Sequence, residues 1–91
     1  MRNWVVPPPP VRARITWTHP PPLRTRCVML SRFDDNPRGW SLVLHDLVPG
    51  ADVTSAEVNF LVEAAPHDRL TPGARLTLLY GPHAVGVVEV L

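Results

Sequence analysis

Residues 75–91 read RLTLLYGPHAVGVVEVL, two apolar runs separated by Gly81-Pro82-His83. A connection of this length and composition between two apolar runs is typical of a β-hairpin. Gly86, inside the second run, indicates a bulge or a close backbone approach, because glycine weakens a regular strand. The sequence therefore predicts an antiparallel strand pair at its C-terminal end.

Four further segments upstream have strand character. Some alternate apolar with polar side chains, as half-buried strands do, and others are apolar runs bounded by Pro, Gly, Asp or Asn. No window has the helical period over ten residues, although residues 64–68 fit a short helical turn. Residues 48–56 are expected to be a turn and an irregular link. Six short strands favour a sandwich or small barrel; they are expected at residues 11–18, 27–33, 40–47, 57–63, 75–80 and 84–91.

The alternation also predicts which side chains fill the interior. It does not fix the facing of the segment at 27–33. The expected interior residues are Ile15, Trp17, Trp40, Val58, Phe60, Val62, Leu76, Leu78, Val88 and Val90.

The chain of 91 residues is long enough for one domain, here residues 11–91. Residues 1–10 end in four prolines and are expected to form a proline-rich arm; a ligand for an SH3-type or WW-type domain is the alternative. No apolar stretch is long enough to span a membrane, and no basic segment precedes an apolar run as in a signal peptide. A single cysteine, Cys27, suits a reducing compartment, so we expect a cytoplasmic protein.

Charge is unevenly spread along the chain. Residues 1–45 hold seven arginines and two aspartates, a formal +5, whereas residues 46–91 hold two arginines and six acids, a formal −4. The basic half is a candidate for contact with phosphate or with an acidic partner. We favour the alternative that the two halves pair across facing strands.

The C-terminal third carries a more specific pattern, LTPGARLTLLYGPHAVGVVEV at residues 70–90. It resembles the end of the C-terminal β-barrel domain of elongation factor Tu, with its Pro-Gly turn, Gly-containing hairpin and Val-Gly strand. Residues 58–62 and 11–17 resemble two other strands of that domain. The resemblance implies a six-stranded antiparallel barrel, in a small stand-alone bacterial protein. No G-x-x-x-x-G-K-[ST] sequence is present, so it does not imply nucleotide hydrolysis.

Groups that could perform chemistry are scattered. The four histidines and Cys27 lack the spacing of a zinc site, and the adjacent Asp34 and Asp35 lack the further oxygen ligands of a calcium loop. No serine lies in a nucleophile elbow. Arg24 and Arg26 could lower the pKa of Cys27, but we expect this cysteine to fill the core. We therefore expect no enzyme activity, metal or cofactor.

The function expected from the sequence is a non-catalytic interaction module whose partner is another protein. Contacts are expected at Arg12 and Arg14 and at the loops around residues 20–22 and 66–69. RNA binding through the basic half is the alternative, which the resemblance supports through the tRNA contact of that family's domain. A third hypothesis is a small enzyme centred on Cys27 and a histidine. The candidate binding residues are Arg12, Arg14, Arg24, Arg26, His67 and Arg69.

The oligomeric state is open between a monomer and a homodimer. If the barrel fails to close, the strand expected at 27–33 could pair with a second copy of itself.

Overall fold

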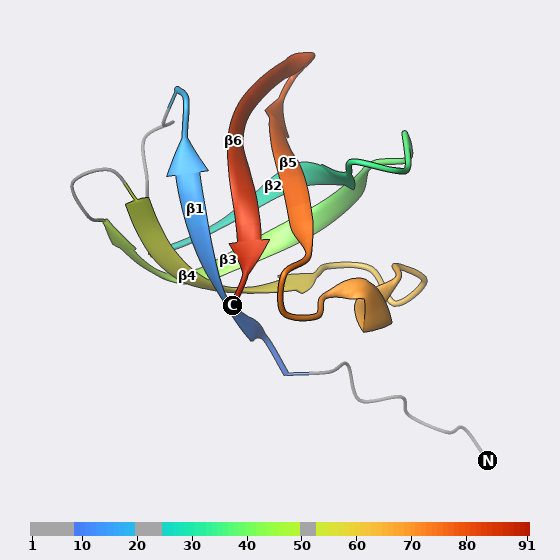
Figure 1. Cartoon of the computed structure of the whole chain (residues 1–91), viewed down its shortest axis with the longest axis horizontal. Helices are drawn as coiled ribbons and strands as arrows, with labels where there is room; N and C mark the ends of the chain where they lie inside the picture. Colours follow the sequence, from blue (N-terminus) through green and yellow to red (C-terminus); the bar gives the residue numbers. More distant parts are fainter. Residues whose placement is uncertain (1–8, 20–24, 50–52) are drawn as a thin grey trace.

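The computed structural model describes residues 9–19, 25–49 and 53–91, and most of them lie in six strands (Figure 1). One 3₁₀ helix, η1, interrupts the connection between the fourth and fifth strands. In the described part of the chain, no helix has the length and apolar character needed to cross a membrane. The elements are β1 (Val11–Trp17), β2 (Arg26–Phe33), β3 (Trp40–Pro49), β4 (Val53–Phe60), η1 (His67–Arg69), β5 (Arg75–Tyr80) and β6 (His83–Val90).

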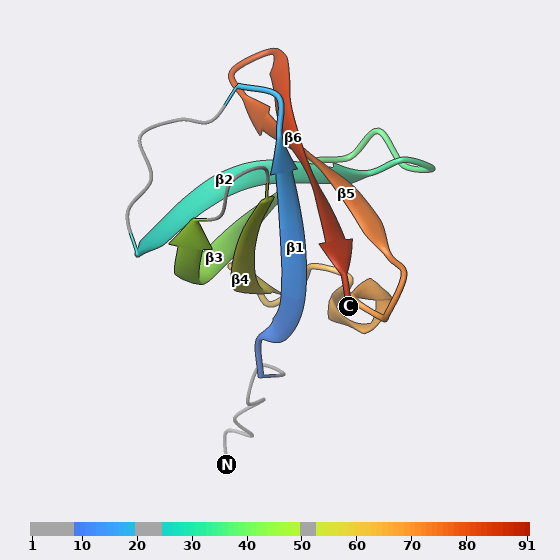
Figure 2. The same ribbon diagram turned by 60° about the vertical axis from the view of Figure 1, so that its left-hand side comes forward.

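The six strands form one closed barrel in the order β1-β4-β3-β2-β5-β6, and every neighbouring pair is antiparallel. Closure depends on β1, which pairs with both β4 and β6: Ile15 lies opposite Thr54 on one side and Val88 on the other. β1, β6 and β5 form one side of the barrel, and β2 and β3 form the other (Figures 1 and 2). The expected all-β barrel is confirmed.

The barrel interior is filled by alternate side chains from all six strands. Ile15, Leu42, Leu44, Leu76 and Leu78 are each 0% exposed. Trp17 and Trp40, which were expected in the interior, are only half-buried and pack against this core from the end of β1 and the start of β3. The other expected interior residues that the core contains are Val58, Phe60, Val88 and Val90.

The prediction for the fourth strand is wrong at both ends. The expected link at 48–56 instead contains the end of β3 and the first half of β4, where Thr54 and Ala56 face the core. β4 ends at Phe60, so Val62 lies beyond the strand and is 44% exposed rather than interior. The run VTSA has small and polar side chains on both faces, so its alternation is hidden in the sequence.

The pairing between β3 and β4 is irregular near the end of β3. The register between them shifts between His45 and Val48, and Asp46 adopts a positive φ of 51° within that interval. Aspartate tolerates this left-handed conformation better than most residues. The bulge lets β3 continue past the expected end of the strand.

β2 has a definite facing that the sequence left open. Met29, Ser31 and Phe33 point inward, and the buried Ser31 hydroxyl donates a hydrogen bond to the backbone oxygen of Trp40 (2.8 Å). β2 pairs with β3 on one side and β5 on the other. It therefore has no free edge, and the expected route to a homodimer through this strand is absent.

The β5–β6 hairpin is confirmed, with Gly81 and Pro82 in its turn. Both interpretations of Gly86 apply at once. Its partner Leu78 lies beside a register shift, and a Cβ at Gly86 would lie 3.0 Å from the Thr16 backbone oxygen and 3.0 Å from Trp17 Cε3. Any larger residue at Gly86 would press on β1, so glycine favours this close approach of β6 to β1.

Candidate binding surfaces

The antiparallel order places the ends of β2, β4 and β6 at one end of the barrel, together with the starts of β1, β3 and β5. We call this end the aromatic end, because Phe33, Trp40, Phe60 and His67 meet there. The Phe60 ring lies 6.0 Å from Phe33, 6.5 Å from Trp40 and 5.8 Å from His67, measured between centroids. All three pairs are tilted or edge-to-face, the geometries that aromatic rings prefer. Phe60 is therefore the centre of a plug that closes this end.

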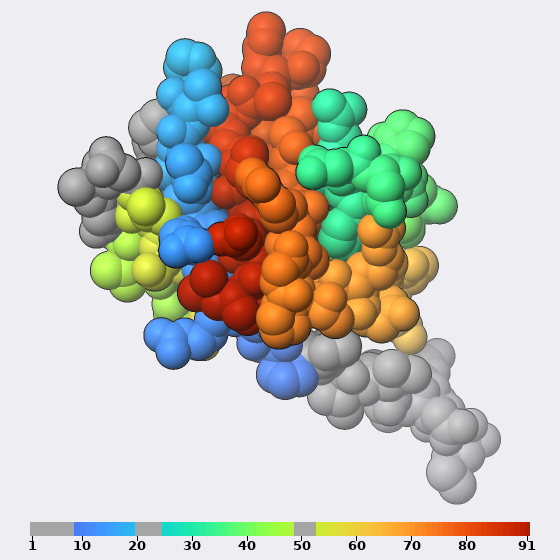
Figure 3. Space-filling view, in the orientation of Figure 1, coloured from blue at the N-terminus to red at the C-terminus, as the bar shows by residue number. Residues whose placement is uncertain are grey.

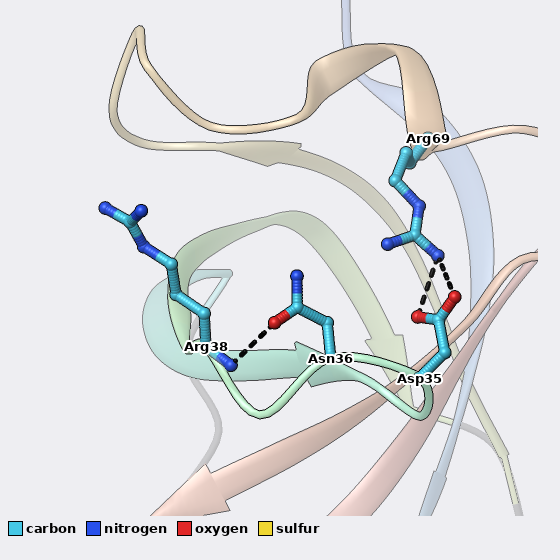
Figure 4. Close-up of polar contacts among 4 residues, drawn as sticks. All are labelled: Asp35, Asn36, Arg38 and Arg69. Carbon is cyan, nitrogen blue, oxygen red and sulfur yellow. Dashed lines mark hydrogen bonds and ion pairs between the residues drawn. The ribbon is translucent and has the colours of Figure 1, made fainter.

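Two arginines cover the aromatic plug from outside. The guanidinium carbon of Arg38 lies 4.2 Å from the Trp40 ring centroid, and that of Arg69 lies 4.1 Å from the Phe33 centroid. Arg69 reaches from η1 to the loop after β2, where its Nη2 donates to both carboxylate oxygens of Asp35 at 2.9 Å (Figure 4). The hydrogen bond from Arg69 is the main cause that lowers the pKa of Asp35. Arg38 points away from this pair (Figure 4).

His67 ties the connection between β4 and β5 to the plug. Its Nε2 lies 3.0 Å from the Val62 oxygen and 3.1 Å from the Glu63 oxygen. Both partners are carbonyls, which only accept, so Nε2 carries the proton and donates to both. The contacts of His67 are those of a residue that fixes a loop.

A shallow groove of about 400 Å³ lies beside the Asp35–Arg69 pair, where the β2–β3 loop meets the segment before β5 (Figure 3). Its charged groups are two arginines and two aspartates, and Arg69 is already engaged. The formal charges of these four side chains cancel, so the groove has no excess charge to attract a charged ligand. Its lining residues are Phe33, Asp34, Asp35, Arg69, Thr71, Gly73, Ala74 and Arg75.

The arginines of β1 face acidic residues on neighbouring strands. Arg12 lies opposite Glu57 on β4, and Arg14 lies opposite Glu89 on β6 and forms an ion pair with it. The hydrogen bond from Arg14, more than its charge, lowers the pKa of Glu89. On this side of the barrel one ion pair, Arg14–Glu89, joins the basic and acidic halves of the chain across strands, as expected, while Arg12 and Glu57 are opposite each other in register.

The arginines of β2 have no such partners. Arg26 lies opposite His45 on β3, and Arg32 lies opposite Thr77 on β5. Neither belongs to the two ion pairs formed within residues 9–19, 25–49 and 53–91, nor does Asp34, two residues beyond Arg32. The side chains of Arg26 and Arg32 are both exposed.

Between these two arginines the outer face of β2 is aliphatic. Val28 and Leu30 point outward and are 43% and 44% exposed. Their cross-strand partners are also apolar: Val43 on β3 lies opposite Val28 but is only 3% exposed, and the half-buried Leu79 on β5 lies opposite Leu30. We call the outward residues Arg26, Val28, Leu30 and Arg32 the β2 stripe.

The six candidate binding residues do not come together. Arg12 and Arg14 lie on the β1 wall, Arg26 starts the β2 stripe, and His67 and Arg69 lie at the aromatic end. Arg24 and the loop at 20–22 lie outside the described residues, as do the first eight residues of the proline-rich arm; Pro9 and Pro10 are exposed before β1. Of the five candidates that the structure describes, Arg26 is the one whose surroundings suit an external partner.

The sequence reasoning missed the aliphatic half of this surface. Its signal is present in RCVMLSR at residues 26–32, where every second residue is Arg, Val, Leu and Arg. Alternate residues share a face of a strand, so the period of two places all four together. The pattern was hidden because the inward residues of β2 are also mostly apolar.

Cys27 and His45 lie on the neighbouring strands β2 and β3, but their side chains lie on opposite faces of the sheet. Cys27 is half-buried against the core, and this burial raises the pKa of its thiol, which disfavours the nucleophilic thiolate. His45 hydrogen-bonds to the Asn59 side chain at 2.8 Å. Among the described residues, no three His, Cys, Asp or Glu side chains are placed to hold a metal ion.

A scan against protein-family models, a search of curated proteins and a search of solved structures each return no match to this chain. The likeness to the last domain of elongation factor Tu therefore stays a prediction, resting on the residues that suggested it.

Proposed function

We propose that this protein is a non-catalytic module that binds another protein through the β2 stripe. One observation carries the proposal: two exposed aliphatic side chains lie between two arginines that have no acidic residue opposite them. Apolar side chains that gather on a surface with a polar rim are typical of protein–protein contacts. Arginine is also enriched where such contacts contribute most to affinity.

The alternative of RNA binding has less support. Single-stranded RNA is held by basic grooves with exposed aromatic rings on which bases stack. Trp17 donates its indole N–H to the Thr54 hydroxyl (3.0 Å), and Trp40 is packed against Phe60. Both tryptophan rings are half-buried against the core. Among the described Trp, Tyr and Phe residues only Tyr80, 68% exposed, has a ring open to a base, and one ring is not a stacking platform, whereas Val28 and Leu30 suit an apolar partner. A cytoplasmic location remains our expectation, because Cys27 is a free thiol.

The proposal is tested by affinity capture from source cells with matched variants. Val28→Thr keeps the shape and strand preference of the side chain but removes an exposed methyl from the stripe. Val62→Thr is the control, because Val62 is equally exposed (44%) but lies on the loop after β4. Captured proteins are identified, purified and titrated against all three chains.

We expect a partner that binds the wild type and Val62→Thr alike and binds Val28→Thr about fivefold or more weakly. Equal binding by all three chains, or a captured complex that nuclease releases, contradicts the proposed function.

A further inference from the structure

The backbone of the β2 stripe is unavailable to a partner. β2 is hydrogen-bonded to β3 on one side and β5 on the other, within a closed barrel. An incoming peptide therefore cannot bind by adding a strand to a sheet edge, which is how many extended peptides bind. Whatever occupies the stripe contacts side chains alone.

The dimensions of the surface match those of an α-helix. Arg32 lies six residue steps along β2 from Arg26, a distance of about 20 Å. The exposed apolar side chains come from β2, with the half-buried Leu79 of β5 beside them, while Val43 of β3 is only 3% exposed and lies beneath them. The three adjacent strands β3, β2 and β5 are together about 10 Å across. A helix of about 14 residues is about 20 Å long and 10–12 Å wide with its side chains. Such a helix laid along β2 covers Val28 and Leu30 and ends near the two arginines.

The charges of Arg26 and Arg32 determine which side chains a bound helix needs at its ends. Arg26 and Arg32 lack acidic cross-strand partners, so acidic side chains at both ends of the helix complement them. A second copy of the stripe is a poor occupant, because a symmetric contact would set arginines against arginines. Residues 1–8 of the chain itself carry Arg2 and no acidic residue, so they also lack the complementary charge.

We infer that the β2 stripe receives an amphipathic α-helix of a partner protein, with an apolar face that acidic residues flank at both ends. This inference rests on the proposed function and names the chemistry of its partner. The aliphatic centre supplies affinity, and the two arginines select the register and sign of charge.

The test uses cross-linked helical peptides of about 14 residues that share one Leu/Ile face. One peptide carries glutamates at both ends of that face, and a second carries lysines there. A third has the glutamates, but a central proline replaces the cross-link, so it cannot form a continuous helix. Affinity for the full chain is measured by fluorescence anisotropy at low and high salt.

We expect the glutamate peptide to bind about tenfold or more tightly than the lysine peptide, with the difference shrinking as salt rises. The double variant Arg26→Gln with Arg32→Gln should remove that preference, and Val28→Thr should weaken both peptides. Val62→Thr should bind like the wild type. The proline peptide should bind no better than the lysine peptide.

Several results would overturn the inference. These are no binding of the glutamate peptide, equal affinity for the glutamate and lysine peptides, or full affinity of the proline peptide. A wild-type dimer in sedimentation that Val28→Thr abolishes would assign the stripe to a second copy. If removal of residues 1–8 makes the chain bind the glutamate peptide tenfold more tightly than the full chain does, the stripe is instead assigned to the protein's own N-terminal segment. If a captured cellular partner depends on Val28 while the glutamate peptide fails, the inference is wrong and the proposed function stands.

Discussion

Replacing Phe60 with leucine tests whether the aromatic end is a specifically packed plug. Phe60 is 3% exposed and makes three aromatic contacts, with Phe33, Trp40 and His67. Leucine keeps much of the apolar volume but removes every ring–ring geometry. Each aromatic pair contributes about 0.5–1.5 kcal/mol beyond simple burial, and truncation of a buried phenylalanine to alanine costs about 3–5 kcal/mol. Because contributions that share one ring are not additive, we expect Phe60→Leu to cost about 1.5–3 kcal/mol.

The assay is equilibrium unfolding in urea at 25 °C, followed by far-UV circular dichroism so that altered Trp40 fluorescence does not enter the signal. With an m-value of about 1.5 kcal/mol/M, the expected loss lowers the urea midpoint by about 1–2 M. Leu61→Ala is the control, because Leu61 is 54% exposed and should change stability by less than about 0.5 kcal/mol. A Phe60→Leu protein within about 0.5 kcal/mol of the wild type would refute the plug.

Four further predictions concern barrel closure, a turn glycine, an ion pair and the thiol. Gly86→Ala should cost about 1–3 kcal/mol in urea unfolding, because its Cβ would meet β1 backbone. Gly73→Ala should cost about 1–2 kcal/mol through its φ of 90° alone, so asparagine should be tolerated better at Gly73 than at Gly86; the reverse order contradicts this account. Arg14→Gln should raise the pKa of Glu89, as measured by a carboxyl NMR titration. Because the folded protein has the lower Glu89 pKa, the Arg14–Glu89 pair stabilises the fold fully above the ordinary carboxyl pKa of about 4.3. This stabilisation is lost as the pH falls through the lowered pKa. An unchanged Glu89 titration would remove that ion pair from the account. Cys27 should react slowly with a disulfide reagent at neutral pH and rapidly in urea, whereas equal rates would show an accessible thiolate.

The parts of the fold that the sequence predicts well are those where apolar and polar residues alternate without interruption. Ile15, Val58 and Val88 face the interior as expected, and the Gly81-Pro82 turn lies where composition predicted it. Val62 continues the same alternation past the end of β4, and periodicity alone cannot show that a strand has stopped.

The prediction fails at the start of β4 for the opposite reason. Thr54 and Ala56 are buried because Ile15 and Ala13 lie opposite them on β1, not because they are strongly apolar. Such burial is decided by tertiary packing, which outweighs the weak local preferences of these residues.

The candidate surface was only partly predictable. The sequence alone does not distinguish Arg12 and Arg14 from Arg26 as binding residues. Only the strand register shows that Arg12 lies opposite Glu57 and Arg14 opposite Glu89. Pairing between β1 and its neighbours therefore decides which arginines remain for a partner.

The central claim is that β2 presents its outer side chains to an acidic helical segment of another protein. The most direct measurement is a ¹⁵N NMR titration of the full chain with the glutamate peptide. We predict shift changes concentrated at Arg26, Val28, Leu30 and Arg32 and at their neighbours on β3 and β5. Changes confined to β1, or to the plug around Phe60, would contradict the account.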